Sequence, residues 1–436
     1  MEKLYRIEKD FLGEKRIELN KYYGIQTLRA KENFNITKTD ISLFPNFIKS
    51  LAKVKKACAL TNFELGDLTD IQKDAIVQAC NEIIDGKFHD QFIVDPIQGG
   101  AGTSTNMNAN EVIANRALEI LGHPKSSYNI IHPNNHINMS QSTNDVYPTA
   151  IKLTLHELIY KLKDALRFLR DCFEEKAIEF KDVLKMGRTQ LQDAVPMTLG
   201  QEFKTFAVMI DDDIYRLRNV QALLKEINLG ATAIGTGINT KASYQRKVIS
   251  NLREVTGVDY VSAGDLIEAT QDTGSFVHIS GMLKSVAIKI SKICNDLRLL
   301  SSGPRAGFNE INLPPLQPGS SIMPGKVNPV MPEVVNQVAF EVIGADMTIS
   351  MASEGGQLQL NVFEPLIAYK LFTSINMMRR AFYSLGEKCI KGITANEDVC
   401  MENILNSVTI VTCLNPLIGY EKCSSLAKEA LRTNKR

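Results

Sequence analysis

The chain has 436 residues, 44% of them hydrophobic and 23% charged, an ordinary globular composition with enough apolar residues for a large core. Its 50 Lys and Arg balance its 49 Asp and Glu, and the net charge of +1 leaves no basic field to attract nucleic acid or an anionic membrane. The charged N-terminus lacks the apolar segment of a secretory signal, and no run of about 18 apolar residues predicts a membrane span, so the sequence predicts a soluble, cytoplasmic protein.

Long helices dominate the predicted secondary structure. Apolar residues recur at spacings of three and four from about Leu51 to Lys87, and the same periodicity covers most of the chain after residue 148. Several of the later helices carry apolar residues around most of their circumference, so we expect neighbouring subunits to cover what one bundle leaves exposed. These later helices exceed the average globular length and are predicted at residues 148–180, 199–227, 265–300, 332–353 and 364–385.

The chain is predicted to form three domains. A mixed N-terminal domain covers residues 1–142, and the long helices form a central bundle over residues 143–397. Shorter helices and turns then form a small C-terminal domain over residues 398–436. The predicted fold class is therefore mainly α, with an elongated central helical bundle.

The first of four polar segments is GGAGTSTNMN, residues 99–108. Its glycines would let the backbone approach a ligand, and Thr103 lies where a helix is predicted to begin, near Asn106. Free N–H groups at a helix start attract carboxylate or phosphate. The alternative is that Ser and Thr in this segment only cap the helix.

The second polar segment, SQSTND at residues 140–145, places Ser142, Thr143 and Asn144 at another helix start. Taken alone, such a run is more often a helix cap than a binding site. Two helix starts rich in neutral hydrogen-bonding groups nevertheless suggest an anionic ligand with two carboxylates.

The third polar segment is GRTQLQDAVPMTLGQEF, residues 187–203. Arg188, Thr189 and Gln190 precede a helix that the sequence predicts to start near Pro196. So many polar residues between apolar helices suggest a site, although a surface loop is the simpler interpretation.

The fourth segment, LQPGSSIMPGKVNPVMPE at residues 316–333, is the most specific. Pro318, Pro324 and Pro329 prevent regular structure, and Gly319 and Gly325 are predicted to act as hinges, which describes a loop able to close over a site. Within it lie two serines, a cation suited to a carboxylate and an amide suited to directed hydrogen bonds. The alternative is a mobile linker. The candidate residues are Ser320, Ser321, Lys326 and Asn328.

Other patterns are predicted to be structural. The eight cysteines are scattered without a CxxC pair, which favours reduced core thiols over disulfides or a metal site. His132 and His136 are four residues apart, but Pro133 between them indicates a loop instead of a metal-binding helix. The segment GATAIGTG, residues 230–237, lacks the P-loop Lys and a preceding strand, and we expect a turn at the end of a helix.

The four polar motifs together resemble one known family. GGAGTS, SQSTND, GRTQLQDAVP and GSSIMPGKVNP follow one another as in the aspartase/fumarase superfamily, and the resemblance covers essentially the whole chain. GSSIMPGKVNPVMPEVVNQV, QSTND and GGQLQLNVFEP resemble the aspartases, whereas class II fumarases typically have SSND in the second motif. The resemblance implies three domains in a homotetramer with a twenty-helix core. Each active site would combine motifs from three subunits.

The resemblance also implies a role for each matching residue. Ser320 matches the general base that removes a proton from Cβ of L-aspartate, leaving an aci-carboxylate intermediate from which ammonia departs to give fumarate. Asn144 matches the contact to the amino group. Groups around the β-carboxylate are matched by Thr103, Ser142, Thr143 and Ser321, and those around the α-carboxylate by Lys326, Asn328 and, from another subunit, Thr189.

Two departures from the family pattern affect this interpretation. Gln190 stands where many relatives have His, and it can orient a substrate by hydrogen bonds but cannot act as an acid. The chain also ends earlier in the third domain than members of the family usually do, which we expect to affect closure of the active site.

The implied activity is therefore ammonia-lyase chemistry on a small-molecule substrate, with no nucleic acid or membrane as a partner. A class II fumarate hydratase is the alternative enzyme, since it shares the base and the carboxylate-binding groups but expels water. A catalytically weak or silent protein of the same fold is the alternative from another class. The implied chemistry requires no cofactor, and the sequence does not indicate whether a divalent cation activates it.

Overall fold

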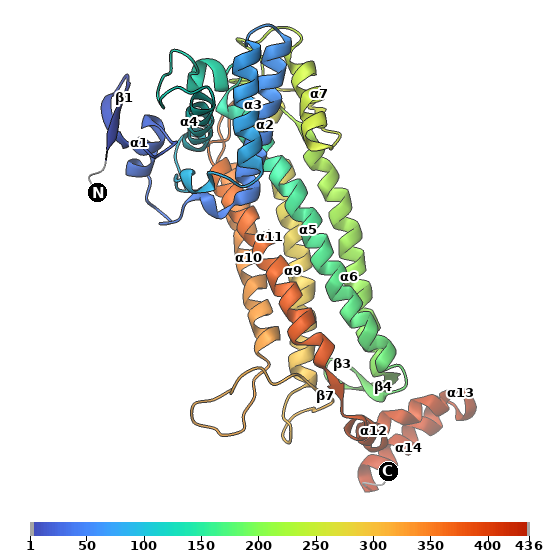
Figure 1. The fold of residues 1–436 in the computed structure, drawn as a ribbon. Helices are drawn as coiled ribbons and strands as arrows, with labels where there is room; N and C mark the ends of the chain where they lie inside the picture. The colour runs from blue at the N-terminus through green and yellow to red at the C-terminus, as the bar shows by residue number, and fades with distance from the viewer. Residues whose placement is uncertain (1–3, 434–436) are drawn as a thin grey trace. The chain divides into compact units, whose positions relative to one another are not determined.

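A computed structural model describes residues 4–433 of the chain (Figure 1). The described residues are mainly α-helical, as predicted, and the short strands form only two-stranded sheets. Two compact units divide the chain. The first contains the described residues of Met1–Tyr160, Arg218–Met282 and Gly344–Ile375, and the second those of Lys161–Leu217, Leu283–Ile343 and Asn376–Arg436. The division into three domains stays a prediction.

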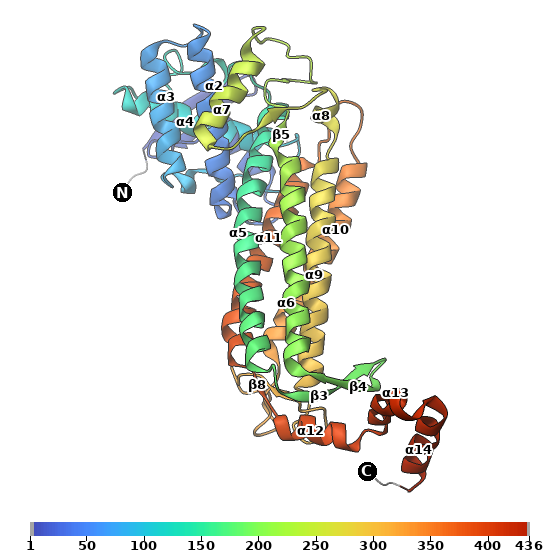
Figure 2. The same cartoon turned by 90° about the vertical axis from the view of Figure 1, so that its right-hand side faces the viewer.

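The first unit is built around a layer of packed helices. Helix α2 packs against α3 and α7, and α3 packs against α4 (Figures 1 and 2). The helical pattern predicted from Leu51 to Lys87 is broken at Gly66, whose φ of +76° turns the chain, and α3 restarts with a capping box between Thr69 and Gln72. The elements are β1 (Tyr5–Asp10), β2 (Gly13–Glu18), α1 (Ile25–Asn33), α2 (Pro45–Glu64), α3 (Asp70–Ile84), α4 (Thr103–Ile120), β5 (Glu226–Ile227), α7 (Tyr244–Thr256), β6 (Val261–Ser262) and α8 (Glu268–Gln271).

Five long helices contribute segments to both units. They are α5 (Thr143–Glu179), α6 (Leu199–Ala222), α9 (Gly274–Leu300), α10 (Val330–Glu354) and α11 (Glu364–Lys388). Four lie within about five residues of the ranges predicted from periodicity, whereas α9 begins at Gly274, nine residues after its predicted start. In the second unit, aromatic rings join α5 to α6, where Phe173 lies 5.6 Å from Phe206 between ring centroids. Lys289 of α9 forms an ion pair of 2.5 Å with the buried Asp213 of α6.

The second unit also contains the short elements after and between these helices. They are β3 (Leu184–Thr189), β4 (Gln192–Thr198), β7 (Ile311–Asn312), β8 (Thr394–Ala395), α12 (Glu397–Asn406), α13 (Asn415–Ile418) and α14 (Tyr420–Thr433). Strand β7 pairs with β8, so the segment that follows α9 is tied to the segment that follows α11.

The hairpin of β3 and β4 corrects one sequence prediction, because Pro196 lies in a strand opposite Met186 and does not begin a helix. The turn residues Gln190 and Leu191 have φ of +54° and +61°, the left-handed pair that closes a tight hairpin. Helix α6 starts only after Thr198, whose hydroxyl accepts a hydrogen bond from the N–H of Gln201 at 3.1 Å.

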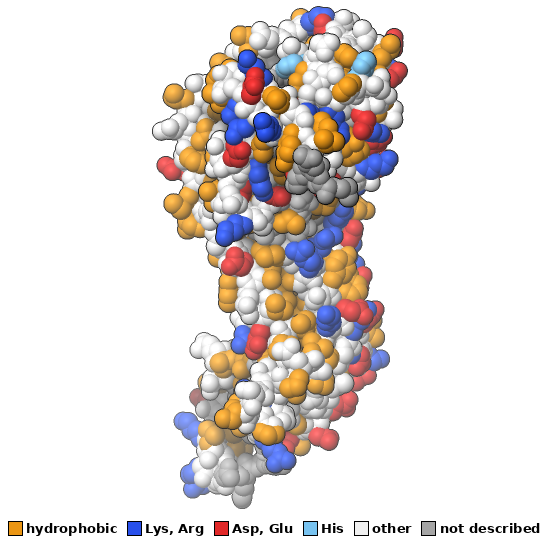
Figure 3. Space-filling model, turned by 60° about the vertical axis from the view of Figure 1, so that its left-hand side comes forward, with side chains coloured by type: hydrophobic (Ala, Val, Ile, Leu, Met, Phe, Trp, Pro, Cys, Tyr) orange, Lys and Arg blue, Asp and Glu red, His pale blue; other side chains and the backbone are white. Residues whose placement is uncertain are grey.

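Helix α10 leaves large apolar side chains in contact with solvent. Phe340, Met347 and Met351 are 62%, 65% and 68% exposed. On the face drawn in Figure 3, apolar side chains lie among side chains of both charges, in agreement with a net charge near zero. Among residues 4–433, no helix is long and apolar enough to cross a membrane. All eight cysteines are free, and seven are buried in the core as predicted, whereas Cys413 is exposed.

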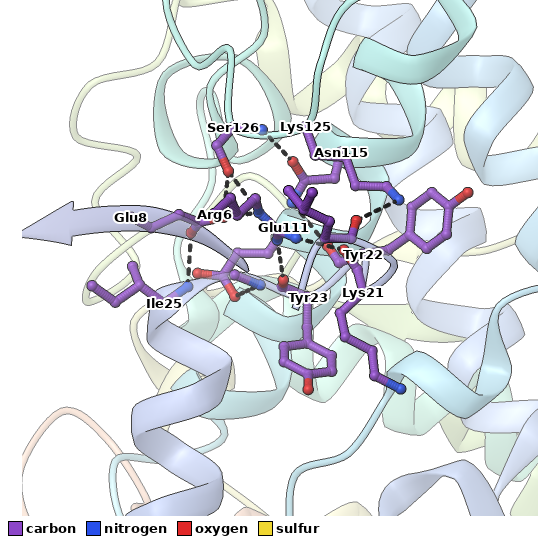
Figure 4. A network of polar contacts seen from close by, with 12 residues as sticks. Arg6, Glu8, Lys21, Tyr22, Tyr23, Ile25, Glu111, Asn115, Lys125 and Ser126 are labelled. Atoms are coloured by element: carbon purple, nitrogen blue, oxygen red, sulfur yellow. Dashed lines mark hydrogen bonds and ion pairs between the residues drawn. The ribbon is translucent and has the colours of Figure 1, made fainter. Parts of the chain in front are cut away.

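Two buried carboxylates hold the N-terminal hairpin and α1 against α4 (Figure 4). Glu111 of α4 accepts hydrogen bonds from the N–H groups of Gly24, Gln26 and Thr27 at 2.7, 2.9 and 3.1 Å. Glu8 of β1 accepts one from the N–H of Ile25 at 2.9 Å. The first N–H groups of a helix have no intrahelical partner, so these carboxylates satisfy the start of α1.

Replacing Glu111 by Gln is expected to reduce the pH dependence of stability. Burial, together with the Glu8 carboxylate, raises the pKa of Glu111 from 4.5 to about 7. A carboxyl group whose pKa is higher in the folded state than in the unfolded state stabilises the fold at pH values below its unfolded-state pKa. This contribution to the unfolding free energy, about 3 kcal/mol, is lost as the pH rises through the folded-state pKa. The unfolding free energy from urea denaturation should therefore fall between pH 4.5 and 7 in the parent chain and fall less in the variant. An equal decrease of the unfolding free energy with pH in the parent chain and the variant would contradict this role of Glu111.

Candidate active site

The first group of candidate residues lines a pocket of about 570 Å³ in the first unit. Thr103, Ser142 and Thr143 lie on its wall together with Asn106 and Thr232. None of its lining residues carries a charge, so the pocket offers neutral hydrogen-bonding groups only. It lies at the starts of α4 and α5, where the positive end of each helix dipole favours an anion.

Close backbone packing fixes the start of α4. Gly102 has a φ of +91°, and a Cβ atom there would lie 2.5 Å from the ring of Tyr147, so only glycine fits. Thr103 follows as the first residue of α4, three positions earlier than the helix start predicted at Asn106, and its exposed hydroxyl donates to the carbonyl of Gly100 at 2.8 Å. The hydroxyl is therefore held at the pocket edge.

A buried carboxylate that sequence reasoning missed orders the start of α5. Asp145 is fully buried, and its Oδ1 accepts a hydrogen bond from the N–H of Ser142 at 2.9 Å. The Ser142 hydroxyl accepts one from the N–H of Asn144 at 3.2 Å, and the Asn106 amide donates to the Thr143 hydroxyl at 3.1 Å. Burial raises the pKa of Asp145 to about 6, against the opposing effect of the N–H groups that it accepts. An Asp in the first turn of a helix is so common that its sequence position gave no signal of this role.

The GATAIGTG segment forms part of the same region. It follows the two-residue strand β5, which corrects the prediction that no strand precedes it. Gly230 and Thr232 have φ of +93° and +57°, so the segment turns back on itself and Thr232 reaches the pocket wall. His132 and His136, which precede Ser142 in the chain, lie at a short π-helical turn (Pro133–Ile137), where the His136 Nδ1 accepts a hydrogen bond from the His132 N–H at 2.8 Å.

The second group, Thr189 and Gln190, lies exposed at the tip of the β3–β4 hairpin in the second unit. A buried ion cluster holds the base of this hairpin. The Glu310 carboxylate lies 2.6 Å from Arg188 and 2.7 Å from Lys185, and Lys185 also lies 2.6 Å from Glu202. Because Glu310 and Lys185 are distant in sequence, only the fold reveals this pairing.

The third group lies on the loop that precedes α10, also in the second unit. The Ser320 hydroxyl oxygen accepts hydrogen bonds from the N–H groups of Ile322 and Met323 at 3.1 and 2.9 Å. Two converging backbone N–H groups stabilise negative charge on the oxygen that they face. Ser320 and Lys326 line a pocket of about 550 Å³ within this loop, and Ser321 and Lys326 are exposed.

Hydrogen bonds close the neck of this loop at Gly319, and a hinge at this glycine stays a prediction. The N–H of Gly319 donates to the carbonyl of Lys326 at 2.8 Å, and the Asn328 amide donates to the carbonyl of Gly319 at 2.8 Å. A Cβ atom at Gly319 would lie 2.7 Å from the Lys326 carbonyl oxygen, so the glycine permits close backbone packing. Gly325, with a φ of +80° and open space around it, forms the free turn at the tip.

The three groups differ in chemistry. The first supplies neutral donors and acceptors, and the third supplies a candidate base and the cation Lys326. Within residues 4–433, no cluster of three or more His, Cys, Asp or Glu side chains has the geometry to hold a metal ion.

Comparison with known proteins identifies the family. A family model described as "Lyase" matches residues 13–344, and one described as "Fumarase C C-terminus" matches residues 410–436. The chain is 60% identical to an aspartate ammonia-lyase of Helicobacter pylori over 430 residues, covering 99% of this chain and 92% of that protein. A fumarate lyase:delta crystallin of Brucella melitensis bound to cobalt is 53% identical with a TM-score of 0.97, covering 99% and 94% of the two chains.

A class II fumarase of Schistosoma mansoni has a TM-score of 0.95 at 35% identity, with coverage of 99% of this chain and 94% of that one. The backbone is thus shared with a fumarase, while the sequence is much nearer to the aspartate ammonia-lyase. Since the lyase model spans most of its length, the chain belongs to the aspartase/fumarase superfamily of lyases.

Proposed function

We propose that this chain is an aspartate ammonia-lyase, which converts L-aspartate reversibly to fumarate and ammonia. The observation that carries the proposal is the pair of N–H groups, from Ile322 and Met323, that face the Ser320 oxygen. This arrangement suits a serine that must act as an oxyanion and remove a proton from carbon. The 60% identity to an aspartate ammonia-lyase supports the choice of substrate.

In the proposed mechanism, Ser320 removes the proton from Cβ, and negative charge develops on the β-carboxylate as an aci-carboxylate. Neutral donors suit this charge, and Thr103, Ser142 and Thr143 supply them from one pocket, joined by Ser321. Lys326, Asn328 and Thr189 bind the α-carboxylate, and Asn144 and Gln190 accept hydrogen bonds from the ammonium group. The chemistry uses side chains and backbone groups only and requires no cofactor.

The proposed site combines groups from different subunits of a homotetramer. The pocket around Thr103 has no charged lining residue, and the loop of Ser320 supplies the cation that a dicarboxylate needs. Neither group is therefore a complete site for aspartate. The exposed Phe340, Met347 and Met351 of α10 support association, because a monomer would leave these apolar side chains in water. We further propose a cytoplasmic location.

Substrate selectivity tests the proposal against the fumarate hydratase alternative. An ammonium group needs neutral acceptors, and Gln190 supplies one where a protonated His would repel it. We expect fumarate to form from L-aspartate at least about 100-fold faster than from L-malate, a preference of roughly 3 kcal/mol in the transition state. The measurement is the rise of fumarate absorbance with each substrate in turn.

The control substrate is D-aspartate, which should give no product because its amino group points away from the acceptors. Equal rates with malate and aspartate would replace the ammonia-lyase proposal by the hydratase. No product from either substrate, with the protein folded, would favour the silent member of the fold.

A further inference from the structure

Asp145 joins two segments that are distant in the sequence and that line the same pocket. Its Oδ1 accepts from the N–H of Ser142 at 2.9 Å, and its Oδ2 accepts from the N–H groups of Gly230 and Thr232 at 2.9 and 3.1 Å. A carboxylate that only capped α5 would need the first of these contacts and neither of the others. Its position therefore serves the 230–233 turn as well as the helix.

The 230–233 turn requires such support. Thr232 is β-branched and has a φ of +57°, a conformation that is costly for this type of side chain. A Cβ atom at Gly230 would lie 3.1 Å from Gln245, so the turn is also tightly packed. Two hydrogen bonds to a fully buried carboxylate offset this strain and fix the turn in place.

The next residue of the turn, Ala233, sets the direction of the Asn144 amide. The Asn144 Nδ2 donates to the carbonyl of Ala233 at 2.7 Å. A carbonyl oxygen can only accept, so the NH2 branch of Asn144 must face Ala233, and its Oδ1 branch is the acceptor on the opposite side. The Asn228 amide holds the same residue by donating to the Asn144 carbonyl at 3.0 Å.

We propose that Asp145 is a positioning residue for Asn144, the side chain that binds the ammonium group of the substrate. By fixing the turn at Gly230 and Thr232, it places the Ala233 carbonyl, which orients Asn144 so that its Oδ1 accepts a hydrogen bond from the substrate ammonium. This proposal rests on the proposed ammonia-lyase function. It assigns a role to the GATAIGTG segment that the proposed mechanism does not otherwise use.

The test is Asp145→Asn, assayed in the direction of aspartate synthesis from fumarate and ammonium. The variant keeps the shape of the side chain but replaces one accepting oxygen by an NH2 group, which cannot accept from the turn. We expect the KM for ammonium to rise about tenfold or more, while the KM for fumarate changes less than about twofold. Fumarate has no amino group, so a general loss of structure would raise both KM values together.

The matched control is Asp95→Asn. Asp95 is also buried and accepts hydrogen bonds from backbone N–H groups, those of Ile36 and Thr37 at 2.9 and 2.8 Å, yet it does not line the pocket. The control variant should lose stability while keeping the ratio of the two KM values. A change of this ratio in the control equal to that in Asp145→Asn would overturn the proposal.

A double variant tests whether Asp145 affects the KM for ammonium through Asn144 or independently of it. In an Asn144→Ala background, Asp145→Asn should have little further effect on the KM for ammonium, because the amide that it positions is gone. Additive effects would overturn the proposal.

If Asp145→Asn does not fold, Thr232→Gly keeps the N–H donor and frees the turn, and we expect the KM for ammonium to rise about threefold. No change in that variant would also overturn the proposal.

The two proposals fail in different ways. If the parent chain does not interconvert aspartate and fumarate, the ammonia-lyase function is wrong. If the parent chain is active and the two KM values of Asp145→Asn rise equally or stay unchanged, the positioning role is wrong and the function stands.

Discussion

Replacing Ser320 by Ala is expected to lower kcat by about three to four powers of ten, because general base catalysis at carbon has no ready substitute in this site. The side chain lies on a loop, and its contacts are the N–H groups of Ile322 and Met323 and not a packed core. We therefore expect an unchanged fold, checked by circular dichroism and sedimentation. Fumarate formation from saturating L-aspartate gives kcat directly.

Ser321→Ala is the matched comparison. It removes a hydroxyl from the neighbouring residue, which is proposed to bind a carboxylate and not to move a proton, so a loss of about 10- to 100-fold is expected. A Ser320→Ala protein that retains kcat within this smaller range would remove Ser320 from the role of base.

Mixing two inactive variants is expected to restore activity if the site is shared between subunits. Ser320→Ala and Thr189→Ala chains, unfolded together and reassembled in equal amounts, should form mixed tetramers in which about one site in four receives both intact residues. The measurement is the aspartate turnover of the mixture against each variant reassembled alone, with sedimentation to confirm the tetramer.

The control mixture combines Ser320→Ala with Lys326→Ala. Both residues lie on one loop of one chain, so every site carries one of the two defects and activity should stay low. Recovery in this control would show exchange or contamination. Failure of the first mixture, with mixed tetramers demonstrated, would place Ser320 and Thr189 of each site on the same subunit.

The sequence predicted the helices well because their signal is local. The periodicity of α6, α10 and α11 repeats over many turns, and their observed bounds lie close to the predicted ones. The β3–β4 hairpin was missed because its turn is Gln190–Leu191, which lacks the Asn-Gly or Asp-Gly signal of a tight hairpin. Pro196, taken as a helix start, is compatible with the strand that the hairpin forms.

The candidate site residues were proposed from motifs, and the structure explains how several are held. The contacts that hold them were beyond sequence reasoning, because the partners are far apart in the chain. Asp145 bonds to Gly230, and Glu310 pairs with Arg188, across about 85 and 122 positions. Buried charged side chains of this kind pair with residues that only the fold brings close, so the local sequence does not predict these pairs.

The closed neck at Gly319 has a consequence for the predicted closure of the Ser320 loop over a substrate. Because Lys326 and Asn328 bond to Gly319 across the base of the loop, the residues between them form one preassembled piece. The backbone N–H groups of Ile322 and Met323, which donate to the Ser320 hydroxyl oxygen, lie in the same segment and would move together with Ser320. Each closure would then deliver an oxygen whose polar surroundings are already in place, and the energy of reorganising them would not enter the barrier to proton abstraction.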